Sequence, residues 1–411
     1  MKSVLLICDS FVPAFAPRMG YLCKYLTDYG WQISVLTEEH SSVGCNVLDK
    51  MPETQCLSYY KRGTKIEWLF KSVADILFAA KDKALYKLYQ KTYNNKKFDL
   101  VLCSTFMQFP LSTASRIASE LKVPLVVDVR DVIEQYVHYE FAKHKIYSLP
   151  WLNDRLHDIR KLFIVKRRNA ILKKADAITT ISTWHKNLLS AFNDKVTIIY
   201  NGYDPELFYP EKLTTEHFVI CYTGRIIGTD MQDPTLLFES LKRMNDLNII
   251  NPKTLVVRWF VDDASANIIK QFADKYGVKS YMDIKTYIPV SEIPSVLKSS
   301  SIILVLTNKQ TVHGPKGIMT TKFFEALATC KPILCVRSDE AGLSSIIKET
   351  NCGIAATTTN EVCDFIDKWQ EYWKTNSYTI IEQDSDKISV YSRKLQAKQF
   401  SDLFDKLIKN V

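Results

Sequence analysis

The segment Gly317–Pro332, GIMTTKFFEALATCKP, sets a charged pair into the apolar face of a predicted helix. Lys322 and Glu325 are three residues apart, so they share one side of the first helical turn. The preceding residues, HGPKG, end in Lys316 and Gly317, and their glycines and proline leave backbone N–H groups open. Open N–H groups at a helix start, with a lysine nearby, can bind an anion. Glu325 can accept hydrogen bonds from sugar hydroxyl groups, so the segment suits a nucleoside diphosphate with its ribose; an ordinary surface Lys–Glu pair is the alternative.

The same segment predicts how the helix begins and which side it buries. Thr320 or Thr321 can cap its start, because a threonine oxygen accepts a hydrogen bond from a free N–H group of the first turn. The apolar stripe comprises Phe323, Phe324, Leu327 and Ala328.

Two other segments place charged residues directly after predicted strands. CYTGRI puts Gly224 and Arg225 at a strand end, where glycine lets a phosphate approach closely and arginine can bind it through two hydrogen bonds. DVRD ends another strand with Asp128, Arg130 and Asp131. The carboxylates can position a hydroxyl group or act as a base, and the arginine can bind an anion. An internal ion-pair network is the alternative for DVRD.

The loop after the first predicted strand, Asp9–Gly20, leads into a helix that starts with Arg18 and Gly20. Two prolines hold this loop extended, so both residues are candidates for the edge of a substrate cleft. An ordinary strand-to-helix loop is the alternative.

No residue pattern indicates a metal site. In FVDDAS, Asp263 or Ser265 is better explained as a helix cap, because no third metal ligand is in view. The seven histidines form neither an HxxxH nor an HExxH pattern. We therefore expect no metal ion and no other cofactor.

Short apolar strands alternate with helical segments along the chain, which predicts an α/β fold with two doubly wound parallel sheets. The strands predicted before the turn-rich connector Asn201–Pro210 are Ser3–Cys8, Gln32–Thr37, Leu100–Ser104, Pro124–Val129, Ala177–Ser182 and Val196–Tyr200. Those after it are Phe218–Gly224, Leu255–Val261, Ser301–Thr307, Pro332–Val336 and Gly353–Thr357. The predicted helices include Arg18–Tyr29, Glu67–Tyr93, Asp154–Lys174, Thr321–Thr329 and a final one over Val390–Lys409. Ligands bind at the carboxyl ends of such strands.

Composition limits the class of protein. The 411 residues suffice for two domains, and the hydrophobic (46%) and charged (24%) fractions are typical of globular proteins. No apolar run approaches the roughly 18 residues of a membrane span, and the start of the chain resembles a strand more than a signal peptide. None of the ten cysteines has CxxC spacing, which favours free thiols in the cytoplasm.

Positive charge concentrates in the first half of the chain. Lys61–Lys97 holds ten Lys or Arg against three Asp or Glu, and Arg155–Lys174 holds eight against one. Such segments attract phosphate groups of lipids or nucleic acids. The first segment also carries Trp68, Leu69, Phe70, Ile76, Leu77 and Phe78. We predict peripheral association with an anionic membrane surface; solvated helix faces are the alternative.

Five segments together resemble a known family over nearly the whole chain: ADAITTIS, VTIIYNGYDPELFYP, ICYTGRI, YIPVSEIPSVLKSSSIILVL and GIMTTKFFEALATCKPIL. They are similar to the retaining, family 4 glycosyltransferases of the GT-B fold, most specifically in the NGYD connector and in TKFFEAL with KPIL. DVRD and the Thr-Lys pair before Glu325 resemble a subgroup that builds bacterial capsule, O-antigen and exopolysaccharide repeat units.

The resemblance implies an acceptor-binding domain over residues 1–205, a nucleotide-sugar-binding domain over 206–385 and a helix in 386–411 that crosses back to the first domain. It places the ribose contact on Glu325 and the phosphate contact on Arg225. The other expected donor-site residues are Gly224, Lys316, Gly317, Thr321 and Lys322. The residues expected on the acceptor side are Arg18 and Gly20, with Asp128, Arg130 and Asp131 as catalytic candidates.

Two family residues are missing. Gly317 stands where the family often has a glutamate that contacts the donor sugar, and no lysine follows the Gly-Arg pair. Lys322 and Lys316 are candidates to supply that charge. The family uses no metal ion, because cations and a helix start neutralise the leaving diphosphate.

The expected function is transfer of a sugar, hexosyl by resemblance, to a lipid-linked glycan by a cytoplasmic protein. Alternatives are a nucleotide-sugar 2-epimerase of the same fold and a non-catalytic nucleotide-binding protein. Nucleic acid is not an expected partner, because no nucleic-acid-binding motif is present.

Overall fold

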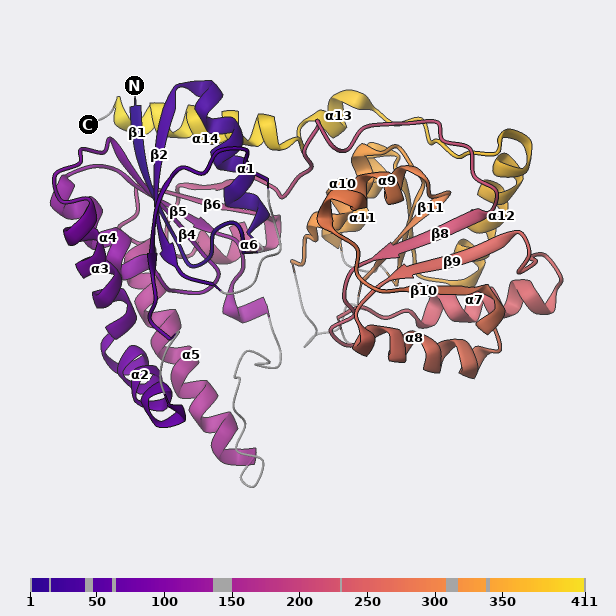
Figure 1. The fold of residues 1–411 in the computed structure, drawn as a ribbon, viewed down its shortest axis with the longest axis horizontal. Helices are drawn as coiled ribbons and strands as arrows, with labels where there is room; N and C mark the ends of the chain where they lie inside the picture. The colour runs from indigo at the N-terminus through magenta and orange to yellow at the C-terminus, as the bar shows by residue number, and fades with distance from the viewer. Residues whose placement is uncertain are drawn as a thin grey trace. The chain divides into compact units, whose positions relative to one another are not determined.

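A computed structural model describes residues 2–14, 16–40, 47–60, 64–135, 150–229, 231–307, 317–337 and 341–409. The chain divides into two compact units (Figure 1). Unit 1 comprises Met1–Tyr200 together with Arg393–Val411, and unit 2 comprises Asn201–Ser392. The sequence suggests boundaries at residues 205 and 385, a few residues from these.

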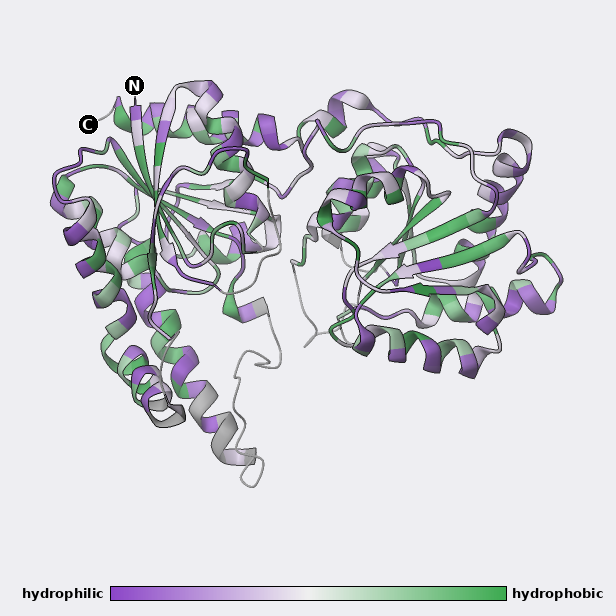
Figure 2. Cartoon of the chain, in the orientation of Figure 1, coloured by the Kyte–Doolittle hydropathy of each residue, from purple (hydrophilic) through white to green (hydrophobic). Residues whose placement is uncertain are grey.

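Unit 1 is built on a parallel sheet with strand order β3-β2-β1-β4-β5-β6-β7. Its strands are β1 (Lys2–Cys8), β2 (Trp31–Glu38), β3 (Glu53–Leu57), β4 (Leu100–Thr105), β5 (Leu125–Val129), β6 (Ala177–Thr180) and β7 (Val196–Ile198). Its helices are α1 (Pro17–Leu26), α2 (Lys65–Phe78), α3 (Ala80–Thr92), α4 (Leu111–Leu121), α5 (Pro150–Leu172), α6 (Thr183–Leu189) and α14 (Arg393–Ile408), with 3₁₀ turns at Thr27–Tyr29 and Ile133–Gln135. The central strands are almost wholly buried, as hydrophobic runs between two helical layers must be (Figure 2).

The single helix predicted over Glu67–Tyr93 is wrong, because the chain breaks into α2 and α3 at Ala79. Ala79 has φ of 50°, a left-handed conformation that ends a helix. Its N–H donates to the Asp75 carbonyl, and α3 begins at the next residue.

Helix α14 belongs to the core of unit 1, although it lies at the other end of the sequence. It packs along α1, and Ala397, Phe400 and Phe404 share a cluster with buried residues of β1, β2 and α1. The indole N–H of Trp31 donates to the Ser401 hydroxyl at 3.1 Å, and the Trp31 and Phe404 rings meet edge to face with centroids 5.3 Å apart.

Unit 2 has a second parallel sheet, with order β10-β9-β8-β11-β12-β13. Its strands are β8 (Phe218–Thr223), β9 (Leu255–Phe260), β10 (Met282–Lys285), β11 (Ile302–Leu306), β12 (Ile333–Val336) and β13 (Gly353–Ala356). Its helices are α7 (Thr235–Asp246), α8 (Asp263–Tyr276), α9 (Ile293–Lys298), α10 (Thr321–Ala328), α11 (Ala341–Thr350), α12 (Thr359–Asn376) and α13 (Ser385–Ser389), with 3₁₀ turns at Lys279–Tyr281 and Val290–Glu292. The prediction of two doubly wound parallel-sheet units is confirmed.

Each sheet has one point where the direction of winding reverses. In unit 1, β1, β2 and β3 follow one another toward one edge of the sheet, and β4 to β7 follow one another toward the other edge. In unit 2, β8 to β10 and β11 to β13 are arranged in the same way. The connections diverge there, which opens a crevice at the carboxyl ends of the two central strands. The fold therefore places one candidate binding edge in each unit.

Candidate functional site

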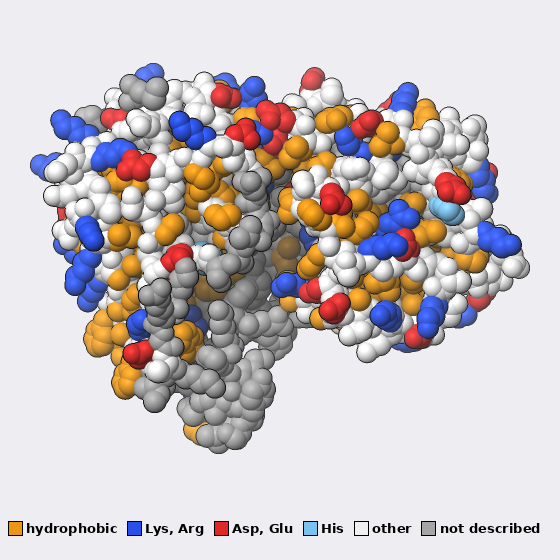
Figure 3. Space-filling view, in the orientation of Figure 1, with side chains coloured by type: hydrophobic (Ala, Val, Ile, Leu, Met, Phe, Trp, Pro, Cys, Tyr) orange, Lys and Arg blue, Asp and Glu red, His pale blue; other side chains and the backbone are white. Residues whose placement is uncertain are grey.

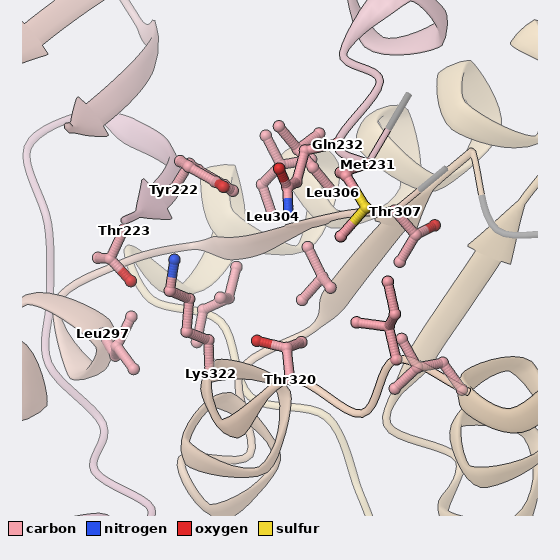
Figure 4. A pocket seen from close by; sticks show the side chains of 14 residues that line it. Tyr222, Thr223, Met231, Gln232, Leu297, Leu304, Leu306, Thr307, Thr320 and Lys322 are labelled. Atoms are coloured by element: carbon pink, nitrogen blue, oxygen red, sulfur yellow. The ribbon is translucent and has the colours of Figure 1, made fainter. Parts of the chain in front are cut away.

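The reversal point of unit 2 holds a small cavity of about 60 Å³ (Figure 4). The end of β8 contributes Tyr222 and Thr223, and the start of α10 contributes Thr320 and Lys322. Most of β11, from Ile303 on, and the following Thr307 also line the cavity. The remaining walls comprise Met231, Gln232, Leu297, Ile318 and Leu343. Segments that the sequence marks separately, CYTGRI and TTKFFEAL, therefore meet at one edge.

Lys322 and Gly224 lie against each other at this edge. A methyl group on Gly224 would stand 1.5 Å from the Lys322 Nζ atom and 2.4 Å from its Cε atom. The φ angle of Gly224 is 120°, which glycine adopts far more readily than other residues. In Figure 4 the Lys322 amine points toward Tyr222 and Thr223, and its Nζ atom is 5.4 Å from the centroid of the Tyr222 ring. The missing side chain of residue 224 thus makes room for the lysine amine.

Burial disfavours the charged form of the Lys322 amine. Burial lowers the pKa of Lys322 to about 8; Glu325 opposes the shift and Arg225 adds to it. Two cations therefore lie near one another at the end of β8, Lys322 beside Glu325 and Arg225 beside Asp262. Two positive groups so placed attract an anion that carries more than one negative charge.

Arg225 extends from the rim of the cavity, with 63% of its side chain exposed. Its Nε atom lies 3.0 Å from an Asp262 carboxylate oxygen, and its pKa is raised, first by a hydrogen bond with Tyr287 and then by nearby negative charge. Asp262 also caps α8 by accepting from the Ser265 N–H at 2.9 Å. The sequence suggests Asp263 or Ser265 as the cap; the structure corrects this to Asp262.

The start of α10 lies next to Lys322. Thr320 is the residue before the first turn, and its side chain makes no capping hydrogen bond. Thr321 and Glu325 are half-buried on the helix, while Gly317, with φ of 67°, leads into it. The predicted buried stripe of α10 is confirmed, since Phe323, Phe324, Leu327 and Ala328 are all buried. Lys316 lies outside the described residues.

Replacing Gly224 with alanine is expected to displace the Lys322 amine. The lysine end can swing away, so we expect roughly tenfold or greater loss of nucleoside-diphosphate affinity and about 1–3 kcal/mol of destabilisation from the backbone. Calorimetric titration and thermal unfolding measure the two effects. Gly277→Ala is the matched control, because Gly277 also has a positive φ (68°) but nothing within 4 Å of the added methyl group. Equal ligand affinity in both variants would contradict the role given to this contact.

At the reversal point of unit 1, Arg18 and Asp128 form a buried network. The Nε and Nη2 atoms of Arg18 donate to the two Asp128 oxygens at 3.0 and 2.8 Å. Arg18 also donates to the carbonyls of Ile199 and Tyr200, and Asp128 accepts from the hydroxyls of Ser104 and Thr179. Burial alone would raise the pKa of Asp128, but Arg18 and the hydrogen bonds outweigh it and leave the pKa lowered.

The buried network favours the structural alternative for Arg18 and Asp128, and their substrate contacts stay a prediction. Both side chains are buried and hydrogen-bonded within the protein. Gly20 has a packing role as well: a methyl group there would stand 2.6 Å from Val47 Cγ2 and 2.8 Å from Val12 Cγ1. The packing of these three residues favours the structural alternative.

Arg130 and Asp131 lie closer to the surface at the same edge. Arg130 pairs with Asp9, which follows β1 and accepts from the Phe106 N–H at 2.9 Å after β4. The pair thus joins the ends of β1, β4 and β5. The Nε atom of Arg130 is buried without a hydrogen-bond partner, and Asp131 is half-exposed. These two residues remain candidates for a substrate contact.

Sequence reasoning misses Asp9 and Tyr287 as members of these sites. Tyr287 follows β10, whose sequence, MDIK, is too short and too polar to predict a strand. If the sequence had predicted this strand, the residues after it would have been candidates for the binding edge. The aromatic side chain is 50% exposed beside Arg225.

The described residues hold no group of three or more His, Cys, Asp or Glu side chains suited to a metal ion. In the described part of the chain the cysteines are free thiols, as predicted, and Cys45 lies outside it. Within the same ranges, no helix combines the length and apolar composition needed to cross a bilayer.

Comparison with known proteins bears on both units. Residues 18–207 match the family model described as Glycosyltransferase Family 4. No curated protein sequence matches the chain significantly. Several solved structures share the fold over almost the full length of both chains, at sequence identities low enough that they show the fold alone.

Sucrose-phosphate synthase from Thermosynechococcus elongatus is 15% identical, with a TM-score of 0.65 and 100% of both chains covered. A glycosyltransferase from Rickettsia africae is 15% identical, with a TM-score of 0.63, covering 100% of this chain and 99% of its own. HepE from Anabaena, solved with UDP-glucose, is 12% identical, with a TM-score of 0.61, covering 99% of this chain and 100% of its own. The chain thus has the GT-B fold, and residues 18–207 are similar to the Glycosyltransferase Family 4 model.

Proposed function

We propose that the chain is a retaining glycosyltransferase that moves a sugar, a hexosyl group by resemblance, from a nucleoside-diphosphate donor to a hydroxyl group of a glycan. The observation that carries the proposal is the Lys322 amine held over Gly224 at the reversal point of unit 2, beside Arg225. The family match over residues 18–207 and the GT-B fold support it. HepE, a protein of this fold, was solved with UDP-glucose, which supports a nucleotide sugar as the donor class.

In this proposal unit 2 binds the donor. Lys322 and Arg225 contact the diphosphate, the glycine at 224 lets it approach the backbone, and Glu325 accepts hydrogen bonds from the ribose. Thr321, Gly317 and Lys316 belong to the same donor site. Tyr287 is added because its ring stands beside Arg225 at the rim.

The chemistry follows from where charge develops. Breaking the bond between sugar and diphosphate leaves positive character on the sugar ring and negative charge on the β-phosphate oxygen. Cations and N–H groups already aimed at that oxygen stabilise the transition state. The acceptor hydroxyl attacks from the same face, and the leaving diphosphate takes its proton, so retention needs no strong protein base. The two cations also offset the charge that a metal ion would otherwise offset.

Replacing Glu325 with alanine is expected to weaken donor binding by roughly 1.5–3 kcal/mol, the value of charge-assisted hydrogen bonds. Titration calorimetry with a nucleoside diphosphate measures the change. Glu349→Ala, an exposed glutamate at the end of α11, serves as the control and should bind like the parent chain. Unchanged affinity in Glu325→Ala would remove this residue from the donor site.

Unit 1 binds the acceptor in this proposal, with Arg130 and Asp131 at its carboxyl edge. Asp131→Asn should lower the transfer rate roughly 100-fold if the carboxylate assists the acceptor hydroxyl, while donor affinity stays constant. Initial rates at saturating donor, compared with calorimetric donor binding, separate the two. Full activity in Asp131→Asn would limit DVRD to its structural role.

We also propose that the acceptor is lipid-linked and that the protein works at the inner face of the cytoplasmic membrane in surface polysaccharide synthesis. The Thr-Lys pair and DVRD support this assignment by their resemblance to enzymes of that pathway.

The decisive experiment incubates the full chain with a panel of nucleotide sugars and follows release of nucleoside diphosphate, with and without lipid-linked glycan acceptors. Acceptor-dependent release is expected, with the new bond keeping the anomeric configuration of the donor. Release of a free epimerised sugar without acceptor would instead support the epimerase alternative. Activity should survive EDTA; loss of activity that a divalent ion restores would refute the metal-free mechanism.

A further inference from the structure

Large apolar side chains stand exposed on two neighbouring helices of unit 1. Eight of the eighteen exposed large hydrophobic residues in the described chain belong to α2 and α5. On α2 they are Phe70, Val73, Leu77 and Phe78, and on α5 they are Trp151, Ile159, Leu162 and Phe163. The most open are Phe70 (70%), Leu162 (69%) and Phe78 (64%). The other ten are spread over the rest of both units.

The exposed residues follow helical spacing. Phe70, Val73 and Leu77 recur at three and four residues, so they line one side of α2. Ile159 and Leu162 share one side of α5 in the same way. An apolar stripe of this kind normally faces a protein core, and here it faces solvent. Of the other predicted membrane-facing residues, Trp68 and Ile76 are half-buried, and the Leu69 side chain lies outside the described part of the chain.

The two helices are fixed to each other. From α5, Arg167 donates to the carbonyls of Asp75 and Leu77 in the last turn of α2, at 3.1 and 2.7 Å. Helices α2 and α5 lie side by side and extend away from the sheet of unit 1 (Figure 1). The next residue of α5, Arg168, is fully buried and pairs with Glu134. The apolar residues are therefore carried on a braced pair of helices.

Cations flank the apolar side of α5. Arg155, Ile159, Leu162 and Lys166 are spaced by four, three and four residues, so one exposed side presents two apolar groups between two positive ones. On α3, Lys83, Lys87 and Lys91 are also exposed. Figure 3 shows hydrophobic side chains at the surface over α2, with Lys and Arg side chains above them.

We propose that the exposed sides of α2 and α5 form a docking surface for an anionic lipid bilayer. Apolar and aromatic side chains enter the boundary between head groups and acyl chains, while the flanking lysines and arginines contact lipid phosphates. The observations favour a bilayer over a second copy of the chain, because pairing two such faces would bring like charges together. The docking surface is independent of the donor site.

The test uses the full chain and vesicles of phosphatidylcholine, with or without phosphatidylglycerol, in a co-sedimentation assay at low and high salt. We expect binding to the anionic vesicles that weakens with salt, and much weaker binding to neutral ones. In Phe70→Ser combined with Leu162→Ser, the partition coefficient should fall at least about tenfold, because apolar area no longer leaves water. Arg155→Glu with Lys166→Glu should weaken binding to anionic vesicles and flatten its salt dependence.

Matched controls come from unit 2. Leu247→Ser and Lys253→Glu change an exposed leucine and an exposed lysine away from the docking surface, and both should bind vesicles like the parent chain. Donor affinity should be unchanged in every variant, so failure of vesicle binding leaves the catalytic proposal intact. Equal binding to neutral and anionic vesicles, or parental binding by the α2–α5 variants, would overturn the proposal. So would a concentration-dependent dimer, seen by ultracentrifugation, that Phe70→Ser with Leu162→Ser abolishes.

Discussion

Replacing Lys322 with alanine should lower kcat by roughly 100-fold or more, the usual effect of removing one preorganised group that meets developing negative charge. The donor dissociation constant should change less, because the charge on the leaving oxygen grows only as the bond breaks. Single-turnover rates at saturating donor measure the first quantity and calorimetry the second. A variant that loses donor affinity but turns over at the parental rate would assign Lys322 to ground-state binding alone.

The same lysine predicts a pH dependence. Its pKa in the free protein is about 8, lowered mainly by burial, and a bound diphosphate favours the protonated amine. Below pH 8 the site is already charged; above it, binding must take up a proton, so affinity should fall by up to tenfold per pH unit. Lys322→Ala should lack this step.

Lys331 is the matched control for that experiment. It too has a pKa lowered by burial to about 8, but its amine donates to the Thr379 carbonyl at 3.0 Å, inside unit 2. Lys331→Met should lower stability and keep the pH step in donor binding. If the pH step in donor binding persisted in Lys322→Ala and disappeared in Lys331→Met, it would belong to Lys331 instead.

Arg18→Met is expected to destabilise unit 1 by about 3–5 kcal/mol, because it strands the buried Asp128 carboxylate without its partner. Thermal and denaturant unfolding measure the loss. Asp128 also sets an acid dependence: its pKa is lowered in the folded protein, so its contribution is present above the unfolded value and is lost as pH falls through the folded one.

The control for Arg18 is an exposed pair of the same kind. Arg116 and Glu120 are four residues apart on α4, with 58% and 43% of their side chains exposed, and Arg116→Met should unfold at nearly the parental temperature. If Arg18→Met were as stable as the parent chain but transferred sugar slowly, Arg18 would be assigned to the acceptor site.

The sequence predicts the central strands of both sheets because buried strands in parallel sheets are continuous apolar runs. It misses β3 and β10, which lie at sheet edges, because half-exposed strands such as ETQCL and MDIK mix polar and apolar residues. The break at Ala79 is missed for a related reason: alanine is a strong helix former, and only tertiary packing explains its left-handed φ of 50°.

Site prediction succeeds or fails for different physical reasons. Gly224 and Lys322 are each candidates on local chemistry, but their contact depends on β8 and α10 meeting at the reversal point, which no local pattern encodes. The sequence does not distinguish a buried charged residue after a strand from a solvent-exposed one. Burial separates Arg18 and Asp128, which are buried, from Asp131, which is half-exposed.

The place of α14 in the core of unit 1 has a consequence for biosynthesis. On the ribosome, all of unit 2 is translated between Tyr200 and Arg393, before the segment that supplies Phe400 and Phe404 to the Trp31 cluster. Until then the apolar side of α1 and Trp31 stays uncovered, which invites chaperones or misassembly. The nascent N-terminal unit should therefore remain protease-sensitive until α14 has emerged from the exit tunnel, and unit 2 should be the first to become resistant.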